Sequence, residues 1–216
     1  MRAHKTLFWK GFIDMHKLLI ATGNPGKIKE LRVLLEGLDV ELVTPKDLGL
    51  DMDVVEDGLT YQENAGKKAL SYCQASGLVS LADDSGLEVD ALDGAPGLYS
   101  ARYSPLPNAT DADRRAYMLK NLNGKPRPWM AHFHATVAIG IPAGQVLFAD
   151  GNCYGEIIPD QRGENGFGYD PIFFIPEANC TMAELSMQQK NRLSHRALAV
   201  KNALPLLERV FSNLLP

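Results

Sequence analysis

The stretch "KLLIATGNPGKIKELRVLLEG", residues 17–37, decides the fold. It opens with an apolar run that ends in glycine, which is the pattern of a strand buried on both faces in a parallel sheet. Pro25 fits the first turn of a helix, and the apolar residues that follow it recur at helical spacing until Gly37. The stretch therefore predicts a strand, a tight turn and a helix, the opening unit of an α/β protein.

The residues that follow repeat this alternation of strand and helix. Apolar runs predict strands over 39–45 and 78–84. Between them we expect a helix that begins near Thr60 and ends at Gly77. Glu63 stands in the capping-box position of that helix. This β-α-β-α-β order indicates an α/β fold with a central sheet.

The second half of the chain has a different character. A segment rich in Gly and Pro leads into a predicted helix that has Thr110 as its cap. One long closing helix is predicted over 188–211. The stretches between these two helices predict antiparallel strands over 131–141, 145–158 and 169–175.

A length of 216 residues suits a single domain. We expect this domain to span 15–216 and to have two lobes around a cleft. The basic and aromatic residues 1–14 lack the apolar stretch and cleavage site of a signal peptide. We therefore expect them to be an N-terminal extension outside the fold.

The charge balance bears on the partners. The formal net charge is -4, from 22 basic and 26 acidic side chains, so there is no global basic field of the kind that attracts nucleic acid or an anionic membrane. Every apolar run is also broken well short of the roughly 20 residues that a membrane-spanning helix needs. We expect neither a nucleic-acid nor a membrane partner.

The cysteines bear on the compartment. Cys73, Cys153 and Cys180 are odd in number and far apart, and no C-x-x-C pairs them. This usage argues against a disulfide framework or a zinc site and favours the reducing cytoplasm.

A polar cluster, "TGNPGK", follows the first strand and covers Thr22 to Lys27. Backbone N–H groups at the start of a helix favour an anion, and Lys27 adds a positive charge. The spacing is not that of a P-loop. Read alone, the cluster indicates either a phosphate-binding loop or an ordinary strand-to-helix turn.

A second cluster is acidic. Glu56 and Asp57 lie in "VVEDG", and Asp83 and Asp84 are predicted to end the third strand. Ligands of open α/β sheets bind beyond the carboxyl ends of the strands, so we expect Asp83 and Asp84 to share one rim with the Thr22–Lys27 cluster. Carboxylates beside a phosphate need a cation between them, and Mg²⁺ is the natural one. The alternative is that these acids are solvated turn residues.

Two further clusters lie toward the C-terminus. "GENGFGYDPIFF", 163–174, frees the backbone around an aromatic ring that can stack on a base, although a glycine-rich hairpin with a core Phe has the same pattern. "KNRLSHR" places Lys190 and Ser194 four residues apart and thus on one predicted helix face. Read alone, that face fits a solvated basic surface equally well.

Taken together, the motifs are recognisable as those of a known family. The stretches "ATGNPGK", "EDGLTYQENAGKKA", "LADDSGLEVDALDGAPGLYSARY", "GFGYDPIFF" and "LSHRALA" stand in the order seen in the inosine triphosphate pyrophosphatase family. The chain resembles this family from about Lys17 to Leu206.

The resemblance implies an activity and an architecture. The activity is the hydrolysis of inosine, deoxyinosine and xanthosine triphosphates (ITP, dITP and XTP) to the monophosphate and pyrophosphate, with Mg²⁺ as cofactor, which cleanses the nucleotide pool. The architecture is an elongated mixed β-sheet flanked by helices, with two lobes around a central cleft, and the protein is expected to be a homodimer.

The resemblance also implies roles for individual residues. Asp84 matches the catalytic proton acceptor, and Glu56 and Asp84 match the metal ligands. The residues that match substrate contacts are Thr22, Gly23, Asn24, Pro25, Gly26, Lys27, Asn64, Lys68, Ser85, Phe167, Gly168, Tyr169, Asp170, Lys190, His195 and Arg196.

A mechanism follows as a hypothesis. Water attacks the α-phosphorus and pyrophosphate leaves, so the protein supplies mainly positioning and electrostatics. We expect Asp84 to orient and deprotonate the water. Lys27 and Lys68 are expected to hold the outer phosphates. Asp83 is expected to support Asp84 or the waters of the metal, and the metal is expected to let both acids stay ionised.

The selection of the purine base is a separate question from the hydrolysis of the triphosphate. The Arg196 guanidinium or the backbone near His195 is expected to reject the 6-amino group of adenine. Two alternatives remain open from the residues, namely an enzyme for a modified pyrimidine triphosphate and a nucleotide-binding module without catalysis.

Overall fold

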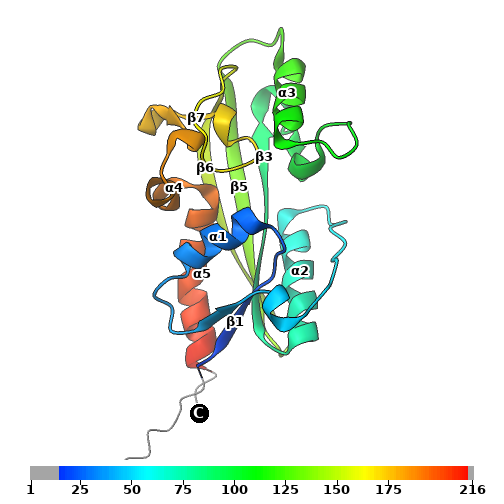
Figure 1. Ribbon diagram of the computed structural model, residues 1–216, viewed down its shortest axis with the longest axis vertical. Coiled ribbons are helices and arrows are strands. Elements are labelled where there is room, and N and C mark those ends of the chain that lie inside the picture. The colour runs from blue at the N-terminus through cyan, green and yellow to red at the C-terminus, as the bar shows by residue number, and fades with distance from the viewer. Residues whose placement is uncertain (1–14, 214–216) are drawn as a thin grey trace, which may run out of the picture.

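The computed structural model describes residues 15–213, so the predicted extension over 1–14 lies outside the described residues. The described chain forms one mixed sheet of eight strands with helices on both faces, which confirms the predicted α/β fold (Figure 1). The strands are β1 (Lys17–Ile20), β2 (Glu41–Val43), β3 (Val79–Val89), β4 (Pro96–Gly97), β5 (Trp129–Gly140), β6 (Val146–Ile157), β7 (Phe173–Ile175) and β8 (Cys180–Thr181). The α-helices are α1 (Pro25–Leu34), α2 (Tyr61–Ser76), α3 (Asp111–Leu122), α4 (Met187–Leu193) and α5 (His195–Ser212).

Three long strands, β3, β5 and β6, run along most of the molecule and give the sheet its elongated shape (Figure 1). The strand order is β2-β1-β3-β5-β6-β7-β8, and β4 also pairs with β3. β1 lies parallel to β2 and β3, whereas the other neighbouring strands are antiparallel. The parallel part is the α/β unit that residues 17–37 predict.

Buried apolar side chains form three clusters, and these define two lobes. In the lower lobe of Figure 1, one cluster packs the sheet against α1 and α5, and a second packs the opposite face against α2. In the upper lobe, a third cluster joins the far ends of the long strands to α3 and β7. The long strands therefore connect two separately packed cores.

Strand β3 does not end at Asp84, as the sequence predicts, but continues to Val89. β5 pairs with it throughout, from Ser80 to Val89, and the side chains of Leu87 and Val89 are buried in the upper core. On its other edge β3 loses β1 after Leu81 and gains β4 only at Leu87. The acidic pair therefore lies in the middle of a strand, beside a local gap in the sheet.

The helix starts follow their predicted caps. The Thr60 hydroxyl accepts from the Glu63 N–H (3.1 Å) and begins α2, but the Glu63 carboxylate accepts from Leu59 N rather than closing a capping box on Thr60. Thr110 begins α3 with a complete capping box. Within residues 15–213, none of the helices combines the length and apolar character needed to cross a bilayer.

The predicted closing helix over 188–211 is wrong in one respect, because it breaks at Ser194. That residue ends α4, and its hydroxyl accepts from Ala197 N (3.3 Å) to begin α5. A serine hydroxyl competes for backbone N–H groups and so favours a helix start over a helix interior. Lys190 and Ser194 consequently do not share a helix face. The predicted strand over 169–175 is likewise shorter, since a 3₁₀ turn occupies Asp170–Ile172.

Candidate active site

A pocket of about 490 Å³ lies between the lobes, within the usual range for small-molecule sites. It is built around the gap in the sheet beside Asp83 and Asp84. At this edge no strand partner satisfies the Asp83 carbonyl, which instead accepts from the Nζ atoms of Lys68 (2.7 Å) and Lys27 (3.4 Å). The gap thus brings two lysines from different helices to the acidic stretch of β3.

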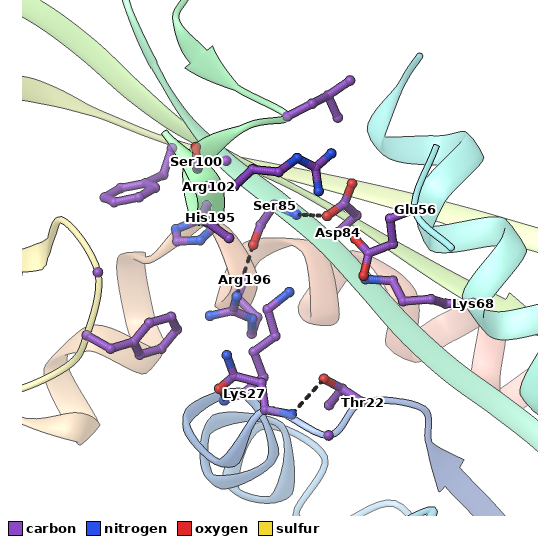
Figure 2. A pocket seen from close by; sticks show the side chains of 18 of the residues that line it. Thr22, Lys27, Glu56, Lys68, Asp84, Ser85, Ser100, Arg102, His195 and Arg196 are labelled. Carbon is purple, nitrogen blue, oxygen red and sulfur yellow. Dashed lines mark hydrogen bonds and ion pairs between the residues drawn. The ribbon is translucent and has the colours of Figure 1, made fainter. Parts of the chain in front are cut away.

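Most residues assigned from the family resemblance line this pocket (Figure 2). Pro25, Gly26 and Asn64 are assigned but do not line it. A Cβ on Gly26 would lie 3.0 Å from the Phe167 ring, which therefore packs directly on the start of α1. The assigned residues that do line the pocket are Thr22, Gly23, Asn24, Lys27, Glu56, Lys68, Asp84, Ser85, Phe167, Gly168, Tyr169, Asp170, Lys190, His195 and Arg196.

Several N–H groups of the Thr22–Lys27 loop are already hydrogen-bonded to side chains of the same loop. The Asn24 side chain accepts from the N–H groups of Gly26 (2.9 Å) and Lys27 (3.2 Å), and the Thr22 hydroxyl accepts from Asn24 N (3.2 Å). The sequence suggests that the N–H groups at the start of α1 are free to bind an anion. Two of them are instead already bonded to the Asn24 side chain. The Lys27 ammonium supplies the positive charge of this loop in the pocket.

Asp83 and Asp84 point to opposite faces of β3, as neighbours on a strand must. Asp83 faces α1 and α5, where its Oδ2 pairs with Lys27 Nζ (3.1 Å) and Arg196 Nε (2.9 Å). Its side chain is fully buried. Burial alone raises the pKa of such an acid, but the charges of Lys27 and Arg196 outweigh it and hold the pKa of Asp83 below its usual range.

The alternation corrects the expected role of Asp83. Its carboxylate does not stand beside that of Asp84, so it is not placed to support Asp84 directly. The two acids avoid repulsion because the strand separates them and because Lys27 and Arg196 neutralise Asp83. Asp83 anchors two cations of the pocket instead.

Asp84 faces α2 and the pocket. Its carboxylate accepts from Asn64 Nδ2 (3.1 Å) and from Ser85 N (3.0 Å). Burial raises the pKa of Asp84 above its usual value, although Lys68 and Lys27 oppose that effect. A carboxyl group held by two hydrogen bonds, with a raised pKa, has the properties of a general base near neutral pH.

The residues present fit a hard divalent cation. Glu56 and Asp84 line the same pocket, and the negative charge of Glu56 raises the pKa of Asp84, so the two carboxylates act on one another. Lys68 Nζ pairs with Glu56 Oε1 (3.2 Å). Among the described residues no group of three or more His, Cys, Asp or Glu side chains is placed to hold a metal. Two carboxylates suit Mg²⁺, which takes its other ligands from phosphate and water.

A buried ionic network forms part of the pocket wall. The sequence assigned Asp170, Lys190 and Arg196 to the site but not Glu30, the partner of the two cations. Lys190 Nζ pairs with Glu30 (2.8 Å) and Asp170 (2.7 Å), and Arg196 pairs with Glu30 as well as with Asp83. The charges of Asp170 and Glu30 raise the pKa of Lys190 against the effect of burial. This network links both lobes, because Asp170 precedes β7 while Glu30 lies on α1. Lys190 and Arg196 are therefore not a solvated basic face.

The three nitrogens of the Arg196 guanidinium all donate to acceptors within the protein. Its Nε donates to Asp83, its Nη1 to Glu30 and its Nη2 to the Ser85 hydroxyl (3.1 Å). We infer that Arg196 acts mainly by holding Ser85 and Asp83 in place. His195, in contrast, stacks on Phe133 with ring centroids 4.7 Å apart. Its buried Nδ1 has no hydrogen-bond partner among the described residues, which leaves it available to a ligand.

The glycine-rich loop is held by α3. Gly168 N donates to Asp111 Oδ2 (2.7 Å), and Gly168 O accepts from Arg115 Nη1 (2.7 Å). The adjacent Tyr169 hydroxyl donates to the Ser100 carbonyl (2.8 Å). Both polar groups of one glycine are thus fixed by one helix, which sets the position of the neighbouring Phe167 ring in the pocket.

This clamp gives a prediction for Asp111→Ala. Losing the acceptor of the Gly168 N–H should loosen the Phe167 loop and raise KM about 3- to 10-fold for a purine nucleoside triphosphate, with kcat little changed. Steady-state kinetics measures both constants. Asp111→Asn keeps an acceptor at the same place and should lose less. An unchanged KM in the alanine variant would remove the clamp from substrate binding.

Several groups at this site were not assigned from the sequence, among them Glu30, Asp111, Arg115 and Arg102. Glu30 follows Lys27 by three residues and so shares its helix face, a spacing that was available as a signal. Arg102 lies within the quoted stretch "LADDSGLEVDALDGAPGLYSARY", which was its available signal. Asp111 and Arg115 had no such signal, because their contacts depend on Gly168, which is distant in sequence.

Comparisons with known proteins agree with the fold and the motifs. The Ham1 family model matches residues 18–206. A dITP/XTP pyrophosphatase from Desulforamulus reducens is 45% identical over 196 residues, which cover 90% of this chain and 97% of that protein.

Solved structures agree as well. The Ham1 protein from Coxiella burnetii has a TM-score of 0.82 at 38% identity and covers 90% of this chain and 100% of its own. The Staphylococcus aureus Ham1 protein has a TM-score of 0.79 at 38% identity, over 89% of this chain and 98% of its own. These matches confirm the resemblance that the motifs indicate, and the chain belongs to the Ham1 family.

Proposed function

We propose that this protein hydrolyses ITP, dITP and XTP to the monophosphate and pyrophosphate and so clears these nucleotides from the cellular pool. The observation that carries the proposal is Asp84, a carboxylate with a raised pKa that lies beside Glu56 and Lys68 in the pocket (Figure 2). The activity named for relatives in the same family supports the choice of substrate.

Each side chain has a role in this reaction. Asp84 orients the attacking water toward the α-phosphorus and takes its proton, while Asn64 and the Ser85 N–H fix the carboxylate. Lys27 and Lys68 bind the outer phosphates from opposite sides of β3. Their positions are held through the Asp83 carbonyl, so the binding geometry exists before substrate arrives.

Glu56 and Asp84 would hold Mg²⁺. When bound, the ion neutralises charge on the phosphate oxygens. The contribution of the chain is to keep the two carboxylates apart from Asp83 and to balance Glu56 with Lys68 while no substrate is present.

The base lies in the part of the pocket that Phe167 and His195 line. Burial lowers the pKa of His195 well below its usual value, so the ring is neutral and its free Nδ1 can make one hydrogen bond to a base. The Phe167 ring offers a stacking surface. Because Arg196 is engaged elsewhere, we propose that backbone groups near His195, rather than the guanidinium, select the 6-oxo group.

A substrate panel tests the function. With Mg²⁺ present, pyrophosphate and monophosphate should form from ITP, dITP and XTP at rates well above those for ATP and GTP, and a chelator should abolish turnover until Mg²⁺ is restored. Modified pyrimidine triphosphates belong in the same panel. Orthophosphate in place of pyrophosphate would exclude attack at the α-phosphorus, and binding without turnover would identify a non-catalytic module.

We also propose a cytoplasmic homodimer. The described cysteines are all free, which fits a reducing compartment. On one face of β5 and β6, Met130 and Tyr154 are exposed, the latter by 65%, and such apolar exposure fits a subunit interface. Sedimentation velocity would return a monomer mass if this assignment were wrong.

A further inference from the structure

Arg102 lies on the 3₁₀ turn Ser100–Arg102, where it lines the pocket. Arg102 differs from the other cationic side chains of the pocket in lacking a carboxylate partner among the described residues. The other lysines and arginines of the pocket each have a carboxylate within salt-bridge distance, and they are Lys27, Lys68, Arg114, Lys190 and Arg196. Within residues 15–213 the Arg102 side chain has neither a salt bridge nor a hydrogen bond. It is the lining cation that an anionic ligand can recruit without breaking an ion pair.

The backbone beneath Arg102 is firmly placed. The Ser100 hydroxyl accepts from Leu87 N (2.9 Å) and donates to Gly97 O (2.6 Å), which ties the turn to β3 three residues beyond Asp84. Tyr169 adds a bond to the Ser100 carbonyl from the glycine-rich loop. The turn therefore holds a constant position relative to Asp84 while the side chain above it remains free to move.

The guanidinium has only a weak resting contact. Its carbon lies 5.1 Å from the centre of the Tyr99 ring, and the two side chains are exposed. Contacts of this kind at exposed sites are weak compared with charge-assisted bonds to phosphate. Figure 2 shows the guanidinium directed into the pocket toward the region of Asp84 and Ser85.

We propose that Arg102 is a catalytic residue that binds the α-phosphate oxygens and stabilises the charge that develops there as pyrophosphate leaves. The proposal rests on the proposed function. Lys27 and Lys68 are restrained by the Asp83 carbonyl and suit the outer phosphates, whereas Arg102 approaches from the side of Asp84, where the water attacks. Its planar fork can hold two phosphoryl oxygens at once.

The test compares Arg102→Gln with a matched control, Arg127→Gln. Arg127 is also an exposed arginine over an aromatic ring, with its carbon 5.1 Å from the centre of the Trp129 ring, but it lies outside the pocket. With ITP and Mg²⁺, Arg102→Gln should lower kcat about 10- to 100-fold and leave KM within about threefold, because the contact forms in the transition state. Arg127→Gln should match the native protein.

Arg102→Lys keeps the charge but loses the fork, so it should recover only part of kcat. A native kcat in Arg102→Gln, or a rise in KM alone, would overturn this assignment while the native activity still supported the proposed function. A native protein that released no pyrophosphate from ITP would overturn both.

Discussion

Asp84→Asn is expected to lower kcat for ITP by about 10²- to 10⁴-fold, the range that a positioned general base contributes. Asparagine has nearly the same shape but keeps only one of the two oxygens, which separately accept from Asn64 Nδ2 and from Ser85 N. The change therefore removes the proton acceptor, one hydrogen bond and one charge of the proposed metal site. Pyrophosphate release under saturating substrate measures the loss.

Stability should move in the opposite direction or not at all. Because burial raises the pKa of Asp84, the folded state disfavours its charged form near neutral pH, and a neutral side chain relieves that cost, which offsets the hydrogen bond that asparagine loses. Thermal unfolding should therefore give a melting temperature at or above the native one. Asp160→Asn, at an exposed position on the turn after β6, is the control and should leave both quantities unchanged. A turnover within a few-fold of native in Asp84→Asn would exclude it as the base.

Arg196→Met is expected to lower the free energy of unfolding by about 3–5 kcal/mol, the usual result of removing one partner from a buried ion pair. Arg196 is 1% exposed and bridges Asp83 and Glu30, so its loss leaves two buried carboxylates short of charge compensation. Asp83 already has one oxygen without a partner among the described residues. Urea unfolding, with a linear extrapolation to water, measures the change.

Arg209→Met supplies the control for this measurement. Arg209 lies on the same helix, α5, but is exposed, and its removal should change stability by no more than about 0.5 kcal/mol. If Arg196→Met does not fold, the double variant with Asp83→Asn provides a second route, since it removes one of the stranded charges and should regain part of the stability. A loss below about 1 kcal/mol in Arg196→Met would show that the network adds little.

The parts of the fold that depend on local pattern could be predicted. The strand and helix of residues 17–37 and the caps at Thr60 and Thr110 follow from periodicity and from hydroxyl chemistry, and the structure has them. Ser194 shows the limit of this approach. A serine within an amphipathic pattern reads as helix interior, and only its bond to Ala197 N reveals a helix start.

The candidate site could likewise be predicted only in part. The family motifs located most of the residues that gather in the pocket and assigned the catalytic role to Asp84, but they did not show what binds Asp83. Asp83 and Asp84 look equivalent in sequence, and their different environments come from partners up to 113 residues away, such as Arg196. Asp111 escaped notice for the same reason, since its partner Gly168 is 57 residues away.

The position of the acidic pair within β3 makes the length of this segment as important as its composition. Because side chains alternate along a strand, one residue inserted or deleted between Val79 and Asp83 would exchange the two faces downstream of it. The carboxylate now held by Lys27 and Arg196 would turn toward α2, and the base would turn into the ionic network. Natural variants with insertions or deletions should therefore carry them in loops such as 104–110 or 141–145. In β3, substitutions should be tolerated far more readily than a change in the number of residues.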